Sequence, residues 1–126
     1  MRAIDTDVLV RLIVRDDSRH TAVAEEFVAR GAWVPTLALV EAMWVLKTVY
    51  ERSAADLAIA VEMLLNHKDL TLQDSDAVTA ALSIFRARPA LGFSDCLLLE
   101  VARKAGHLPL GTFDRGLGRM GGVRKL

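Results

Sequence analysis

Two acidic side chains, Asp5 and Asp7, stand one residue apart in the stretch IDTDVLV, where a short apolar start meets a longer apolar run. Three further acids attract attention: Glu41 inside TLALVEAMWVLKTVY, Asp95 in GFSDCLLLEVA and Asp114 in GTFDRGL. Clustered carboxylates without cysteine or histidine suit a hard, oxygen-preferring ion such as Mg²⁺ or Mn²⁺ and not zinc. If the fold brings these acids together, we expect them to bind a divalent metal.

The elements that must position these acids alternate between short strands and helices, which predicts an α/β fold with a central parallel sheet flanked by helices. The expected strands are MRAID, AWVP, LTLQ, LPLGTF and a weak last strand near VRKL. The expected helices are TDVLVRLIV, RHTAVAEEFVAR capped by Ser18 and ended by Gly31, a helix from Thr36 to about Tyr50, AADLAIAVEMLLN capped by Ser53, DAVTAALSIFRAR capped by Asp74 or Ser75, DCLLLEVARKA capped by Ser94 and ended by Gly106, and a short helix from Asp114.

The fold class predicts where three of the acids lie. In an open parallel sheet, ligands bind outside the carboxyl ends of the strands. Asp5 ends the first strand, Asp114 ends LPLGTF, and Asp95 occupies the first turn of a helix behind Ser94. We expect all three to face one cleft.

Glu41 is a candidate for a different reason: its neighbours on the predicted helix are the apolar residues Leu37, Ala38, Trp44 and Val45, so its carboxylate is expected to lie against the core. An ionised carboxylate against an apolar core costs on the order of several kcal/mol unless a positive charge compensates it. Asp95 has the same difficulty beside Leu98, Leu99 and Ala102. For any single acid, an ion pair with Lys or Arg or a position at the rim explains the pattern; for the set together, a shared cation explains it better. Without that cation, at least one carboxylate should have a raised pKa.

Composition limits the class of protein. The chain has 126 residues, of which 52% are hydrophobic and 25% charged, as expected for one globular domain spanning residues 1–126. No apolar run is long enough to span a bilayer, and acids stand where a signal peptide has its apolar stretch, so we expect a cytoplasmic protein. The single Cys96 excludes an internal disulfide and is expected in the core, while His20, His67 and His107 lack zinc-ligand spacing.

The 16 basic and 16 acidic residues balance overall, but the end of the chain is basic. From Val101 onward a single acid, Asp114, stands against Arg103, Lys104, Arg115, Arg119, Arg124 and Lys125. This region is a candidate for contacts with phosphates. An ordinary solvated surface is the alternative.

The ordered set IDTD, the Glu in LALVEAMWVL, GFSDCLLLEVA and GTFDRGL resembles the PIN-domain ribonucleases, most closely the VapC-type toxins, over the whole chain. The resemblance implies a catalytic metal site formed by Asp5, Glu41, Asp95 and Asp114, with Mg²⁺ or Mn²⁺ as cofactor. It also implies that Ser94 and Thr112, the small hydroxyl residues beside the last two acids, orient carboxylates or water.

Asp7 departs from the family pattern, because relatives often have Asn or Ser at this position. Its carboxylate either adds a metal ligand or caps the following helix.

The function implied by the resemblance is that of a divalent-metal-dependent endoribonuclease, the toxin of a type II toxin–antitoxin pair. One or two ions activate water and neutralise charge on the scissile phosphate. The implied partners are RNA, a small antitoxin protein and a second copy of the chain. Candidate residues for an apolar interaction surface are Trp33, Trp44, Met43, Val49 and Tyr50, although a Trp at helical spacing is more often in the core.

Two alternatives remain open. DTDVLV also fits the opening of haloacid-dehalogenase-type phosphatases, with Asp5 as nucleophile and Asp7 as general acid, but that mechanism leaves Glu41 and Asp95 unused and lacks a convincing later Lys. The other alternative is a PIN-like scaffold that binds RNA or protein without cutting.

Overall fold

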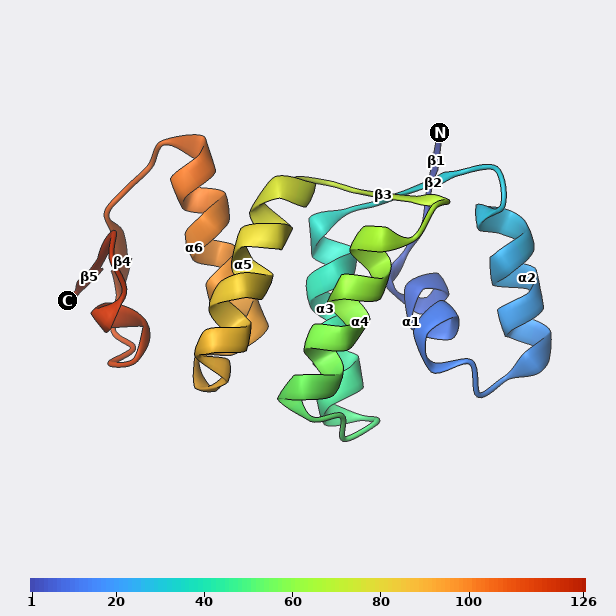
Figure 1. Cartoon of the computed structure of the whole chain (residues 1–126), viewed down its shortest axis with the longest axis horizontal. Coiled ribbons are helices and arrows are strands. Elements are labelled where there is room, and N and C mark those ends of the chain that lie inside the picture. The colour runs from blue at the N-terminus through green and yellow to red at the C-terminus, as the bar shows by residue number, and fades with distance from the viewer. The chain divides into compact units, whose positions relative to one another are not determined.

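The computed structural model describes residues 1–126, and the chain forms two compact units, Met1–Ser75 and Asp76–Leu126 (Figure 1). The α-helices are α1 (Thr6–Val14), α2 (Ser18–Val28), α3 (Thr36–Thr48), α4 (Ala54–Asn66), α5 (Ser75–Ala87) and α6 (Phe93–Ala105). The strands are β1 (Arg2–Ala3), β2 (Ala32–Val34), β3 (Leu70–Leu72), β4 (Leu110–Thr112) and β5 (Val123–Lys125). Two short 3-10 helices cover Pro89–Leu91 and Leu117–Arg119.

The first unit contains a three-stranded parallel sheet in the order β1-β2-β3. Its register pairs Ala3 with Trp33 and Val34 with Leu72. Each parallel connection needs a crossover, and two helices supply it in both cases: α1 and α2 between β1 and β2, and α3 and α4 between β2 and β3. The strands therefore all point the same way, and Asp5 follows the carboxyl end of β1.

Helices α1 and α3 pack against each other in the core of the first unit. Their apolar faces bury Leu9, Val10 and Leu12 of α1, and Ala38, Leu39, Ala42, Met43 and Leu46 of α3. Helix α3 follows Pro35, which offers no capping side chain, and the Gln73 side chain accepts a hydrogen bond from the Thr36 amide at 2.9 Å instead. This bond fixes the start of α3 to the end of β3.

The second unit contains α5, α6 and a two-stranded parallel sheet of β4 and β5. Phe85 and Phe93 join α5 to α6 by an edge-to-face contact of 5.9 Å between ring centroids. Cys96, Leu97 and Leu99 of α6 are also buried. The predicted α/β class with parallel strands is confirmed, with the five strands arranged in a sheet of three and a sheet of two.

Several predicted helix ends are shifted. Asp17, and not Ser18, caps α2, because its carboxylate accepts a hydrogen bond from the His20 amide at 3.1 Å. Helix α6 begins at the buried Phe93 after Gly92, whose φ of 82° reverses the chain, so Ser94 lies inside the first turn and is not the cap. Ser53 caps α4 as predicted.

No helix has both the length and the apolar character that crossing a membrane requires.

Candidate active site

Asp5 lies at the junction of β1 and α1, where it is the N-cap of the helix. Its backbone is extended, and its Oδ1 atom accepts a hydrogen bond from the Val8 amide at 3.1 Å. This bond satisfies one of the free amides at the helix start and fixes the carboxylate. The Oδ2 atom of this exposed side chain has no hydrogen bond or ion pair within the protein.

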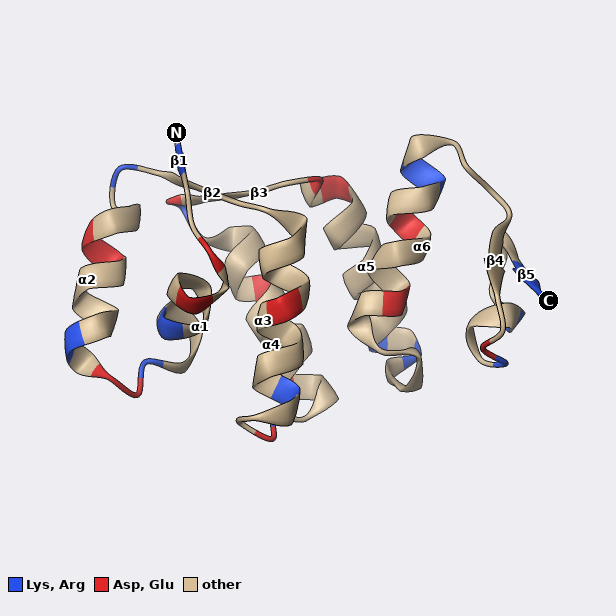
Figure 2. Cartoon of the chain, turned by 180° about the vertical axis from the view of Figure 1, so that it is seen from behind, with Lys and Arg blue, Asp and Glu red and all other residues tan.

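Glu41 is linked to this junction through Thr6. The Thr6 hydroxyl donates a hydrogen bond to Glu41 Oε2 at 2.9 Å, and Thr6 directly follows Asp5. Figure 2, with Asp and Glu in red, shows acidic positions at the start of α1 and in the middle of the neighbouring α3. The structure therefore brings Glu41 into contact with Thr6, the residue that follows Asp5 in the chain.

Thr6 is not among the site residues that the sequence pattern predicts. The available signal was a hydroxyl residue at the first position of the helix that Asp5 precedes. Which side chain its hydroxyl meets depends on the packing of α1 against α3, which the local sequence does not specify.

The argument that placed Glu41 against the core is wrong. Glu41 is exposed, and two of its helix neighbours, Leu37 and Trp44, are 69% and 64% exposed. Helix α3 buries a different face, centred on Leu39, Ala42 and Leu46. The Glu41 carboxylate therefore lies in water beside exposed apolar side chains.

Asp95 lies in the first turn of α6 and is half-buried. Burial raises the pKa of its carboxyl group, and the charge of Asp114 raises it further. This result agrees with the prediction that at least one carboxylate has a raised pKa without metal. It also shows that Asp95 and Asp114 repel each other.

Asp114 follows β4 and is exposed. Its Oδ2 atom accepts a hydrogen bond from the Leu117 amide at 2.6 Å. Its own amide donates to the Thr112 hydroxyl at 3.0 Å, so Thr112 fixes the backbone of Asp114 and not its carboxylate. The Ser94 hydroxyl is exposed and forms no hydrogen bond.

None of the four predicted site acids forms an ion pair, a feature that they share with Asp7, Glu26, Glu51, Asp56 and Asp69. Partnered acids include Asp16 with Arg11, Glu25 with Arg15, Glu100 with Arg103, and Asp76 with Lys104. The simplest structural explanation for the site acids, a salt bridge to Lys or Arg, is therefore absent.

The donor chemistry of these acids fits a hard divalent cation, because each offers only carboxylate oxygens. Asp5 and Glu41 belong to the first unit, whereas Asp95 and Asp114 belong to the second. No group of three or more His, Cys, Asp or Glu side chains forms a metal-binding cluster in the structure.

Asp7 is exposed in the first turn of α1. The prediction that it caps this helix is wrong, because Asp5 occupies the cap position. Asp7 lines a hollow of about 350 Å³ together with Val8 and Arg11 of α1 and residues of α2. The pKa of Arg11 is raised chiefly by its hydrogen bond to the Tyr50 hydroxyl, and the charge of Asp7 adds a smaller contribution.

Cys96, His20 and His67 were predicted to have no catalytic role. Cys96 is buried, and burial raises the pKa of its thiol, with a further contribution from Asp95. His20 lies 3.0 Å from the Asp17 carboxylate, and His67 Nδ1 accepts a hydrogen bond from the Asp69 amide at 3.1 Å. These environments agree with structural roles for Cys96, His20 and His67.

Part of the basic C-terminal region has partners of its own. Arg103 bonds to Glu100 and to the Gly121 carbonyl, and Lys104 bonds to Asp76. Four exposed bases without an ion pair remain as candidates for phosphate contacts, namely Arg115, Arg119, Arg124 and Lys125.

Comparison with known proteins gives one match. The family model described as PIN domain matches residues 3–123, a range that extends across both units. No curated protein and no solved structure matches the chain.

Proposed function

Since the chain belongs to the PIN domain family, which generally comprises metal-dependent nucleases, we propose that it is an endoribonuclease and the toxin of a type II toxin–antitoxin pair. The observation that carries the proposal is that Asp5, Glu41, Asp95 and Asp114 occur in the order of the family's acidic residues and none of them is neutralised by Lys or Arg. A salt bridge to Lys or Arg would compete with a cation for the carboxylate oxygens, so the absence of such partners leaves these acids available as metal ligands.

In this proposal the four acids hold Mg²⁺ or Mn²⁺. A bound divalent ion activates water and neutralises charge that develops on the scissile phosphate. For three of the acids, hydrogen bonds fix one carboxylate oxygen: Val8 for Asp5, Thr6 for Glu41 and Leu117 for Asp114. The other oxygen of each carboxylate has no protein partner and is available to a cation.

The positioning groups follow from the same bonds. Thr6 orients Glu41, and Thr112 holds the backbone of Asp114. Asp95 has no such donor, and its raised pKa means that a proton competes with the cation for its carboxylate. Ser94 stays in the proposal as a hydroxyl that orients ligands or water, on the strength of the family resemblance.

The toxin assignment rests on the resemblance to VapC-type proteins. It implies a small antitoxin that keeps the nuclease inactive, a homodimer, and action on RNA in the cytoplasm. Of the predicted interaction residues, Trp44 and Val49 are 64% and 66% exposed and are available to a partner. Met43 is 4% exposed and belongs to the core, so its assignment to such a surface was wrong.

The phosphatase alternative loses its basis, because the PIN domain model matches nearly the whole chain. The non-catalytic PIN scaffold remains as the alternative that the following experiment tests.

Purified, partner-free protein should cleave total RNA in Mg²⁺ or Mn²⁺, and EDTA should abolish cleavage. The Glu41→Gln variant serves as a control for contaminating nucleases, because it keeps the acceptor for Thr6 and loses the charge. RNA that stays intact in both metals would favour the scaffold. Cleavage that persists in EDTA would contradict the metal-dependent mechanism.

A further inference from the structure

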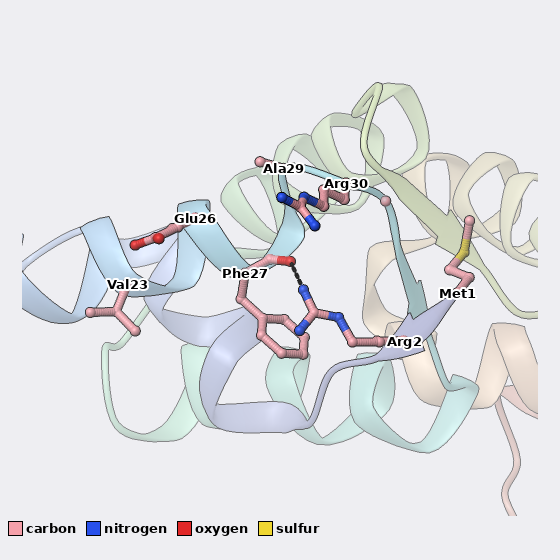
Figure 3. Close-up of a pocket in the computed structure, with 8 residues that line it drawn as sticks. Met1, Arg2, Val23, Glu26, Phe27, Ala29 and Arg30 are labelled. Atoms are coloured by element: carbon pink, nitrogen blue, oxygen red, sulfur yellow. Dashed lines mark hydrogen bonds between the residues drawn. The ribbon is translucent and has the colours of Figure 1, made fainter.

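A second feature of the first unit lies at the amino end of β1, away from the predicted acids. A hollow of about 760 Å³ is lined by residues of the β1 start and of the carboxyl end of α2, among them Arg2, Glu26, Phe27 and Arg30 (Figure 3). Arg2 opens β1 and Asp5 follows its other end, three residues later and roughly 10 Å away along an extended backbone. The hollow is therefore distinct from the predicted metal site.

Two contacts orient the exposed side chain of Arg2 in this hollow. Its Nη2 atom donates a hydrogen bond to the Phe27 carbonyl at 3.1 Å, and its guanidinium lies 3.9 Å from the centre of the Phe27 ring. Both contacts orient the guanidinium without neutralising it, and most of its N–H donors stay unused. An oriented guanidinium with unused N–H donors can bind an anion.

Arg30 adds a second uncompensated positive charge. It is exposed, lines the same hollow and forms no hydrogen bond or ion pair. The small residues on either side of it, Ala29 and Gly31, leave its guanidinium accessible. Figure 3 shows both guanidinium groups reaching toward the carboxyl end of α2, and Glu26, the acid of this lining, pointing away from them.

The two guanidinium groups have no carboxylate between them, so they repel each other, and a shared anion relieves that repulsion. Arginine forms paired hydrogen bonds with phosphate oxygens, and the apolar wall of Val23 and Phe27 suits the nucleoside beside the phosphate. We propose that this hollow binds a phosphodiester group of single-stranded RNA, with Arg2 and Arg30 as its ligands. The identity of the polymer rests on the proposed ribonuclease function.

The charge of the whole chain supports a local site. Basic and acidic residues balance, so general attraction between the chain and RNA is weak. Loss of one arginine from the hollow should then lower the affinity for RNA measurably, because non-specific binding contributes little. The short distance to Asp5 also allows one RNA strand to contact the hollow and the acid within a few nucleotides.

The test is the affinity of the full chain for a short, labelled oligouridine, measured by fluorescence anisotropy in EDTA at several salt concentrations. We expect Arg30→Gln to weaken binding about tenfold, the size of one lost charge-assisted contact, and to reduce the salt dependence by about one phosphate contact. Arg19→Gln is the matched control, because Arg19 is an exposed, unpaired arginine in the first turn of α2, outside the hollow. It should stay within about twofold of the unsubstituted chain by the same reasoning.

Thermal melting separates binding from folding. Arg30→Gln removes no internal bond and should melt like the unsubstituted protein. Arg2→Lys keeps the charge but loses the planar fork, and it should weaken RNA binding at a temperature where the variant is shown to be folded.

Equal losses in the Arg30 and Arg19 variants, or no loss in either, would overturn the proposal. So would displacement of the oligouridine by an acidic peptide more readily than by unlabelled RNA, which would assign the hollow to a protein partner. Uridine monophosphate binding as tightly as the oligomer would assign it to a free nucleotide and also overturn the RNA assignment. Because EDTA prevents metal-dependent cleavage, this experiment measures binding alone. The binding proposal can therefore be tested whether or not the protein is a nuclease.

Discussion

The two pairs of predicted site acids differ in how the protein holds them. In the first unit, Asp5 and Glu41 are exposed, and each has one oxygen fixed by a donor from α1. In the second unit, Asp114 is fixed by an amide, whereas Asp95 is half-buried without a donor and is opposed by the charge of Asp114. The first pair is therefore oriented by the fold, and the second pair contains an acid whose ionisation is disfavoured.

If all four acids bind one cation, as proposed, this difference gives the two pairs different tasks. Oriented carboxylates determine where a cation binds, and a carboxylate with a raised pKa gains most from the arrival of that cation, because the positive charge offsets both burial and repulsion. Variants of the first pair should thus lower activity with little change in stability. Variants of the second pair should change activity and metal-free stability together.

The largest expected effect belongs to Asp5→Asn. We expect it to lower RNA cleavage by more than about 100-fold, because losing a direct metal ligand should exceed the roughly 10- to 100-fold cost of losing an outer-shell partner. Asn is as good an N-cap as Asp, so the bond to the Val8 amide should survive and the melting temperature should change little. Single-turnover cleavage and thermal melting measure the two effects. Near-normal cleavage by a folded Asp5→Asn protein would remove Asp5 from the catalytic residues.

Asp95→Asn tests the second pair through pH. The raised pKa of Asp95 means that the folded chain keeps this proton to a higher pH than the unfolded chain, whose ordinary value is 3.8. The stability associated with the protonated group is complete below that value and is lost as pH rises through the folded pKa. In metal-free buffer at neutral pH, Asp95→Asn should therefore raise the melting temperature slightly, by on the order of a degree or two, and abolish cleavage.

Melting curves from acidic to neutral pH provide the check on this prediction. The loss of stability with rising pH should be smaller in Asp95→Asn than in the unsubstituted chain, and added Mg²⁺ should stabilise only the latter. A lower melting temperature for the variant throughout this range would show that the Asp95 charge has a stabilising partner.

Thr6→Val removes the hydroxyl that orients Glu41 and keeps the shape of the side chain. We expect roughly a tenfold loss of activity at limiting Mg²⁺ and a higher Mg²⁺ requirement, with partial recovery at saturating metal. Thr6→Ser keeps the hydroxyl donor, so its Mg²⁺ requirement should equal that of the unsubstituted protein. A purely steric role of Thr6 does not predict this result. A Mg²⁺ titration of cleavage for the three proteins decides between these roles.

The local sequence predicted the elements that carry the acids better than it predicted the contacts of those acids. The apolar period of TDVLVRLIV located α1, and the alternation of strands and helices gave the parallel pairing. The position of Asp5 after the first strand followed directly. These features depend on residues that are close in sequence.

Errors arose where residues far apart in sequence decide the outcome. Glu41 has apolar neighbours along its helix, but the packing of α1 and α4 buries another face of α3 and leaves Leu37 and Trp44 exposed. The bond from Thr6 joins positions 35 residues apart. The prediction of the α2 cap was wrong for a local reason. The adjacent residues Asp17 and Ser18 are equally good N-caps, and the backbone conformation decides which of them takes the cap position.

The smallest effect is expected for Asp7→Asn, because the structure assigns the helix cap to Asp5 and leaves Asp7 exposed in the first turn of α1. A negative charge there interacts favourably with the helix dipole and with Arg11, so its loss should cost about 0.3 to 1 kcal/mol of stability at low ionic strength and less in salt. Cleavage should remain within about twofold, since such a surface change leaves Asp5, Thr6 and Glu41 untouched. If Asp7 instead ligates the metal, the Mg²⁺ requirement of the variant should rise while cleavage recovers at saturating Mg²⁺. Running Asp7→Asn beside Thr6→Val in one Mg²⁺ titration makes the comparison direct: a larger shift for Asp7→Asn would make Asp7 a third acid of the first unit's site.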